Sequence, residues 1–268
     1  GQKLLFARID RADKYGSRQA DIYEYDFDVD EPGFVHDVLW TLPVMVAGTA
    51  PESPRIKQLT HGLRALYPTY SPDGEWIAFV HNKGTNNNLG IMKADGTQIR
   101  YLTDLTDGTQ LYTPRWSPDG SQLLFTDALT GGGLTTERGG RANIWALSMA
   151  DREARTLIEL DSNEGHADVS PDGRWVAYHS DLSGRPEIYI DAFPALGERT
   201  LISTSGGRAP LWSADGRELF FLSIDGRQIY GVSFVVIRPE SGTGPGSPLD
   251  TIFVQHWFQE LSRLVPVD

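Results

Sequence analysis

The 268-residue chain contains no cysteine, which excludes disulfide bonds, thiolate metal sites and cysteine nucleophiles. It also lacks a long apolar run. The longest, residues 38–48, contains Thr41 and Pro43 and is far shorter than the roughly 20 residues that a membrane-spanning helix needs. Residues 1–20 show no basic segment followed by an apolar stretch, so any secretion signal has been removed or lies upstream. We therefore predict no membrane span.

Positive charge is also scarce, because 24 Lys and Arg residues face 36 Asp and Glu residues and the formal net charge is −12. A strongly acidic chain repels phosphate backbones and anionic lipid, so we predict no nucleic-acid partner. Helical periodicity is nearly absent and occurs only in residues 255–264. By contrast, 28 Gly, 16 Pro and 7 Trp with 40% hydrophobic residues indicate a turn-rich globular fold.

A repeated turn motif dominates the sequence. Ser-Pro-Asp-Gly, or Ser-Ala-Asp-Gly in the last copy, occupies residues 71–74, 117–120, 170–173 and 213–216. Proline suits the first central position of a tight turn, aspartate tolerates the second, and glycine takes the left-handed conformation. Alternating apolar residues follow each turn, as in a half-buried strand. A fifth copy of this strand opens the chain, with Leu4 and Phe6 at the matching offsets from Gly1.

Each repeat contains signals for four short strands. One strand precedes the turn, one follows it, and two more recur further along. Four strands at a period of 40–50 residues are typical of a β-propeller blade. The third strand is expected around Ile22, Leu89, Ile144, Ile188 and Ile229, and the fourth near residues 56–60, 99–103, 155–158, 200–203 and 249–254.

These residues resemble the TolB-like, WD-related β-propeller repeats of bacteria, whose signature is an aromatic residue, Ser-Pro-Asp-Gly and then an apolar-aromatic strand. The resemblance implies an all-β propeller of six four-stranded antiparallel blades in a periplasmic or other extracytoplasmic protein, although only five repeats can be found. Residues 208–232 and the segment around Trp257 also resemble the C-terminal ends of bacterial multidomain proteins, in which such a propeller follows a protein kinase or a winged helix.

We predict a single propeller domain over residues 1–268, with an insert at 26–54 and a C-terminal tail at 255–268. Either the stretch from Gly1 to Gly74 hides a degenerate blade or the chain is truncated at its N-terminus. The first repeat lacks its innermost strand, and residues 251–257 are the apolar candidate to supply it. The tail either docks as a short amphipathic helix or is disordered.

The sequence carries no catalytic signature. Gly-x-Ser-x-Gly, Gly-Lys-Ser/Thr and His-Glu-x-x-His are all absent, so we predict no catalytic residues and no cofactor. Asp26, Asp28 and Asp30 have the spacing that opens a calcium loop, but Glu31 and Pro32 stand where that loop needs glycine. We interpret this segment as the solvated face of a strand and predict no metal site.

The candidate site lies where the innermost strands begin. Equivalent positions there carry Tyr67, Thr113, His166 and Ala209, and the positions two residues on carry Thr69, Arg115, Asp168 and Leu211. Varied side chains on a constant frame are typical of a binding surface. Alternatively, Arg115 and Asp168 pair with neighbouring blades. His179, whose residue type could also ligate a metal, is interpreted as a surface or core-edge histidine. The predicted partner-binding residues are Tyr67, Arg115, His166, Asp168 and Arg208.

The absence of catalytic motifs favours a non-enzymatic scaffold or sensor propeller that binds a protein or peptide at its channel mouth. We expect a monomer or one domain of a larger chain. The alternative is the substrate-filtering propeller of a prolyl-oligopeptidase-type serine peptidase, whose Ser-Asp-His residues lie on a separate domain that is lacking here.

Overall fold

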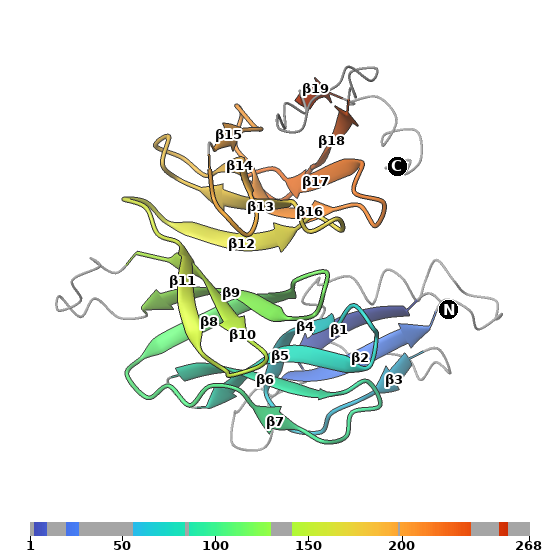
Figure 1. Ribbon diagram of the computed structural model, residues 1–268. Helices are drawn as coiled ribbons and strands as arrows, with labels where there is room; N and C mark the ends of the chain where they lie inside the picture. The colour runs from blue at the N-terminus through green and yellow to red at the C-terminus, as the bar shows by residue number, and fades with distance from the viewer. Residues whose placement is uncertain are drawn as a thin grey trace. The chain divides into compact units, whose positions relative to one another are not determined.

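The computed structural model describes residues 3–9, 20–26, 56–83, 86–129, 141–197, 199–236 and 252–256 (Figure 1). The regular elements in these ranges are β-strands, and they form five antiparallel sheets. None of these residues belongs to a helix with the length and apolar character needed to cross a membrane. The chain divides into two compact units, Gly1–Leu157 and Ile158–Asp268, which are described separately. The all-β fold predicted from the sequence is confirmed.

Three sheets belong to the first unit, and in each the strands pair in chain order (Figure 1). The described part of the first sheet has three strands, β1 (Lys3–Ile9), β2 (Ala20–Asp26) and β3 (Ile56–Gln58). The second has β4 (Ala65–Tyr70), β5 (Trp76–Lys83), β6 (Asn86–Lys93) and β7 (Arg100–Tyr101). The third has β8 (Thr109–Trp116), β9 (Gln122–Leu129), β10 (Asn143–Ser148) and β11 (Ala154–Ile158), the last of which ends at the unit boundary.

The second unit holds two four-stranded sheets with the same order. One consists of β12 (Glu164–Val169), β13 (Trp175–Ser180), β14 (Glu187–Ala192) and β15 (Thr200–Leu201). The other consists of β16 (Arg208–Trp212), β17 (Glu218–Leu222), β18 (Ile229–Val236) and β19 (Ile252–His256). We call the five sheets blades 1 to 5 in chain order.

Strand β19 corrects two expectations for the C-terminal segment. It pairs antiparallel with β18 as the fourth strand of blade 5, so residues 252–256 do not supply an innermost strand to blade 1. Gln255 and His256 lie in this strand, so the predicted tail helix does not begin at residue 255. The rest of the tail and almost all of the predicted insert at 26–54, apart from Asp26, lie outside the described residues.

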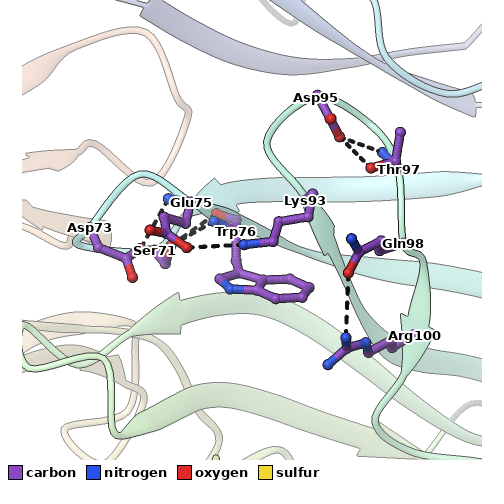
Figure 2. A network of polar contacts seen from close by, with 9 residues as sticks. All are labelled: Ser71, Asp73, Glu75, Trp76, Lys93, Asp95, Thr97, Gln98 and Arg100. Atoms are coloured by element: carbon purple, nitrogen blue, oxygen red, sulfur yellow. Dashed lines mark hydrogen bonds and ion pairs between the residues drawn. The ribbon is translucent and has the colours of Figure 1, made fainter.

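The repeated turn forms as its residues predict. Gly74, Gly120, Gly173 and Gly216 have φ between +69° and +71°, the left-handed region that only glycine adopts without strain. In the first copy, the hydroxyl of Ser71 donates to the carboxylate of Asp73, and Oδ1 of Asp73 accepts the backbone N–H of Glu75 at 3.0 Å (Figure 2). These bonds close the turn between β4 and β5 and lower the pKa of Asp73. The same turn also joins β17 to β18 at residues 223–226, which the sequence reading missed.

Apolar faces of adjacent blades pack against each other within each unit. Blades 2 and 3 share a core that includes Val80, Leu111 and Phe125, and blades 4 and 5 share one that includes Ala177 and Phe221. Trp212 belongs to the core of blades 4 and 5, and the partly buried Trp76, Trp116 and Trp175 pack against these cores. Face-to-face packing of four-stranded sheets is the arrangement by which propeller blades bury their apolar surfaces.

Cationic side chains cover the half-buried ring of Trp76 in blade 2. Lys93 lies opposite it on β6, with its ammonium 4.4 Å from the centre of the indole ring and 2.9 Å from the carboxylate of Glu75 (Figure 2). The guanidinium of Arg100 on β7 lies 4.9 Å from the same ring. Cations over an indole face cover a half-buried aromatic without a further apolar layer. These side chains shield the indole of Trp76, the first residue of β5, from water.

Candidate interaction site

The first strand of each of blades 2 to 5 is interrupted by a β-bulge at the same place. The register of β4 with β5 shifts between Leu66 and Thr69, and the other three blades shift at the equivalent residues. The residue at the bulge has φ between +48° and +55° in every case. These four bulge residues are Tyr67, Thr113, His166 and Ala209.

The bulge has a physical basis in the sequence. Pro68, Pro114 and Pro210 directly follow three of the bulge residues, and proline is tolerated inside a sheet at a bulge because it lacks the N–H that the ladder needs. A non-glycine residue in the left-handed region costs on the order of 1 kcal/mol or more. Four such positions in register, none of them occupied by glycine, show that the surrounding frame imposes this conformation.

A buried polar network fixes the segment that leads into the bulged strand. In blade 1, the carboxylate of Asp21 accepts the hydroxyl of Thr60 at 2.8 Å and the backbone N–H groups of Gly62 and Leu63 at 2.9 and 3.1 Å. Thr60 Oγ1 in turn accepts the N–H of Ile22. These bonds hold the connection from β3 to β4, and so position Tyr67.

The same network recurs in two other blades. Asn88 accepts the hydroxyl of Thr103 and the N–H of Leu105 ahead of β8. Glu187 accepts the hydroxyl of Ser203 and the N–H of Gly206 ahead of β16. We call the residue pairs Asp21/Thr60, Asn88/Thr103 and Glu187/Ser203 the anchors. The sequence reading missed them, although in each of these repeats a polar residue directly precedes the apolar residue that marks the third strand, and Ser or Thr stands two residues after the fourth strand.

In the first unit, the site residues are aromatic and hydroxyl-bearing. Tyr67 is 41% exposed and its ring meets that of Tyr112 edge-on, with centroids 6.2 Å apart. Partial burial of the Tyr67 side chain raises its pKa, and the neighbouring Tyr112 raises it further. Thr113 is buried, and its hydroxyl lies 3.4 Å from that of Thr126 on β9. Arg115 donates to the carbonyl of Pro114 at 3.3 Å.

In the second unit, the equivalent pair consists of two histidines. The rings of His166 and His179 lie 5.0 Å apart and are tilted by 40°. They occupy the places that Thr113 and Thr126 take in blade 3, counted from the turn glycine. Burial lowers the pKa of His179 to about 3, with the neighbouring His166 and Arg208 acting in the same direction and Asp181 opposing them. His179 is therefore neutral at pH 7.

Asp168 and Arg208, also predicted to bind a partner, differ in their surroundings. Oδ2 of Asp168 accepts the backbone N–H of Trp212 at 2.8 Å, a bond from blade 4 to blade 5. In the first unit, the carbonyl of Thr69 similarly accepts the indole N–H of Trp116. This contact favours the alternative in which Asp168 pairs with a neighbouring blade, and its role in binding stays a prediction. Arg208 is exposed at the start of β16.

The structure also contains a polar hollow that the sequence did not indicate. A cavity of about 610 Å³ in the first unit lies between β1 and β2 on one side and the turn after β4 on the other. At one side of it, Glu24 accepts hydrogen bonds from the hydroxyl of Tyr70 and from Lys3. Further residues that line it are Lys57, Ser71, Pro72, Asp73, Gly74, Ala94 and Asp95.

Within the described part of the chain, no group of three or more His, Asp or Glu residues is arranged to hold a metal ion. The residues 28–30 of the calcium-like segment lie outside the described ranges, while Asp26 ends β2.

Comparisons with known proteins agree with this architecture. No protein-family model matches the chain. "Uncharacterized peptidase YuxL" of Bacillus subtilis (strain 168) is 28% identical over 174 residues, which are 54% of this chain and 25% of that protein. "Protein TolB homolog" of Chlorobium chlorochromatii (strain CaD3) is 29% identical over 185 residues, 60% of this chain and 37% of that protein. The chain thus spans well under half the length of either curated relative.

Among solved structures, a putative TolB from Agrobacterium tumefaciens matches with a TM-score of 0.60 at 17% identity, covering 95% of this chain and 80% of that one. Repeated four-stranded antiparallel sheets that pack face to face define the chain as a β-propeller protein. More particularly, it is a TolB-like β-propeller, as the turn motif and the matches in both sequence and structure show.

Proposed function

We propose that this chain is a non-enzymatic interaction module that binds a protein or peptide through the bulged starts of its first strands. The observation that carries this proposal is the contrast between backbone and side chains at the bulge residues. The backbone conformation is the same in four blades, whereas the side chains are tyrosine, threonine, histidine and alanine. A rigid scaffold with variable side chains at one repeated place is suited to recognition.

The wider context of the proposal comes from the comparisons. Similarity to a TolB homologue supports an interaction role and a periplasmic or other extracytoplasmic location. The chain matches only part of each curated relative, which is consistent with a domain of a longer protein. A kinase-linked sensor remains our prediction for that longer protein on the residue pattern of the C-terminal repeats.

Selection from a displayed library of random peptides tests the interaction role. Tyr67 is the exposed aromatic among the bulge residues, and such residues dominate binding energies at interfaces. We expect Tyr67→Ala to lower the affinity for the selected peptides at least about tenfold. Arg115→Ala and His166→Ala should each lower the affinity for a subset of these peptides. Binding is measured by isothermal titration calorimetry, and circular dichroism checks that each variant is folded.

The matched control is Tyr101→Ala on β7, since Tyr101 is 50% exposed but lies on the fourth strand of its blade. Its peptide affinity should equal that of the wild type. The proposal fails if no peptide is selected, or if the Tyr67 and Tyr101 variants lose affinity equally.

A second candidate is the substrate-filtering propeller of a prolyl-oligopeptidase-type serine peptidase. The similarity to the peptidase YuxL favours it, because the matched region is a quarter of that protein and leaves room for a separate catalytic domain. In this case the bulge residues would contact peptide substrates rather than a stable partner.

A further inference from the structure

A cluster of nitrogen-bearing side chains stands out in the second unit. Ala177 on β13 packs into the core between blades 4 and 5, and His179, two residues further along the strand, lies on the same face of the sheet. That face meets β16, which contacts both β12 and β13 and begins with Arg208. His166 completes the cluster through its ring contact with His179.

The two histidines are not needed to build a blade. At the place of His179, blades 2, 3 and 5 carry Val80, Thr126 and Leu222, and Val80 is completely buried there. An apolar or hydroxyl side chain therefore satisfies the packing requirement. Burying an imidazole instead costs free energy, because the ring loses its hydration. Its Nδ1 atom is buried and has no hydrogen-bond partner among the described residues.

Arg208 adds a permanent positive charge beside this pair. Its backbone belongs to the β16–β17 ladder, but its side chain makes no hydrogen bond or ion pair with any residue in the described ranges. It is close enough to His179 to disfavour protonation of that ring. Asp181 opposes the effect of Arg208 on His179, and its carboxylate accepts the backbone N–H and the side-chain amide of Asn163, each at 2.8 Å. Asp168 is bonded to the N–H of Trp212. Both acids thus have partners of their own.

We propose that Arg208, His166 and His179 form a subsite for a carboxylate group, so that the partner of the proposed interaction module presents an acidic side chain or a free C-terminus to blades 4 and 5. This inference rests on the proposed function and specifies its ligand chemistry. A guanidinium donates two parallel hydrogen bonds to a carboxylate, and an imidazole N–H donates a third. One guanidinium beside the neutral ring of His179 matches a singly charged anion better than a doubly charged phosphate.

Histidine-detected NMR on the full chain tests the subsite directly. The probe is N-acetylglycine, a small free acid, and N-acetylglycinamide is its uncharged counterpart. We expect the acid, and not the amide, to shift the ring signals of His166 and His179 and to raise the pKa of His179 toward its ordinary value. Inorganic phosphate at the same concentration should produce a weaker shift. Equal effects of acid and amide, or a stronger effect of phosphate, would overturn the carboxylate assignment.

Substitutions at Arg208 test whether its charge is needed for binding while the fold is kept. Arg208→Ala should lower the affinity for N-acetylglycine at least about tenfold, because a charge-assisted bidentate contact is lost. Arg208→Lys should retain part of the binding. The matched control is Arg217→Ala in the turn before β17, where the side chain is 83% exposed, and it should bind like the wild type. His179→Thr introduces the residue that blade 3 has at this place, Thr126, so the variant should fold normally but bind N-acetylglycine more weakly.

The peptide selection described above distinguishes failure of this inference from failure of the proposed function. Peptides that bind without a carboxylate and are insensitive to Arg208→Ala would refute the subsite and leave the interaction role intact. Binding of N-acetylglycine without any selected peptide would retain the subsite and refute the interaction role. Absence of both would refute the two together.

Discussion

At the scale of single residues, the four bulge positions share one backbone conformation but carry different side chains. Tyr67, Thr113, His166 and Ala209 all take a positive φ, although none is glycine. The ladder on either side of the bulge and, in three of the four blades, the anchored segment before it offset the cost of this conformation. The side chain at the bulge is then free to vary, which is the physical basis for the recognition role that we propose for it.

His179 provides a pH prediction at the same scale. Its pKa is lowered from 6.5 to about 3 in the folded chain, so below about pH 6.5 the unfolded state binds a proton that the folded state excludes. Folding stability therefore falls as the pH drops from about 6.5 toward 3. We expect His179→Thr to remove on the order of 3 kcal/mol of the stability loss between about pH 7 and pH 4, measured by urea unfolding.

The control for this measurement is His61→Thr, because His61 is exposed. The turn aspartates, whose pKa values are lowered mainly by serine hydroxyls, contribute acid sensitivity equally to all three proteins. A wild-type pH profile that His179→Thr leaves unchanged would show that the histidine is not held neutral.

At the scale of elements, the anchors hold the segments that lead into three of the four bulged strands, β4, β8 and β16. Removing the carboxylate of Asp21 leaves a threonine hydroxyl and two backbone N–H groups without their acceptor. We expect Asp21→Ala to lower the free energy of unfolding by about 3 kcal/mol, because the buried hydroxyl of Thr60 and two part-buried N–H groups all lose their acceptor. Asp21→Asn should cost less, since Asn88 does the same work in blade 2.

Denaturant unfolding monitored by tryptophan fluorescence measures these differences. Glu153→Ala serves as the surface control, because Glu153 is exposed and such changes are usually within about 0.5 kcal/mol. A loss below about 1 kcal/mol for Asp21→Ala would contradict the anchoring role.

At the scale of the whole molecule, the chain matches a quarter of a peptidase and just over a third of a TolB homologue. If it is an interaction module, the chain alone should hydrolyse neither peptide esters nor oligosaccharides, with or without a divalent metal. A chromogenic turnover assay checks this. Turnover that is abolished by Asp168→Asn, with folding retained, would contradict the non-enzymatic assignment and place a reactive carboxylate beside the bulge of blade 4.

Much of the architecture follows from the sequence by itself. Serine, proline, aspartate and glycine at fixed offsets close a turn by local hydrogen bonds and backbone preference, and alternating apolar residues extend the strands on either side. The four turns that precede the second strands, and the third and fourth strands of the blades, were predictable for this reason, whereas the copy at 223–226 was missed. The equivalence of Tyr67, Thr113, His166 and Ala209 also followed from counting back from the turn glycine.

Tertiary structure decided what local patterns do not encode. The bulge arises because strand pairing shifts its register there, and the contact of His166 with His179 depends on two strands that meet only in the folded sheet. Strand β19 joined blade 5 because pairing with β18 satisfies its backbone hydrogen bonds, a choice that apolar character alone did not settle. Asp168 likewise gained its partner from the next blade. Long-range pairing, and not residue type, made each of these distinctions.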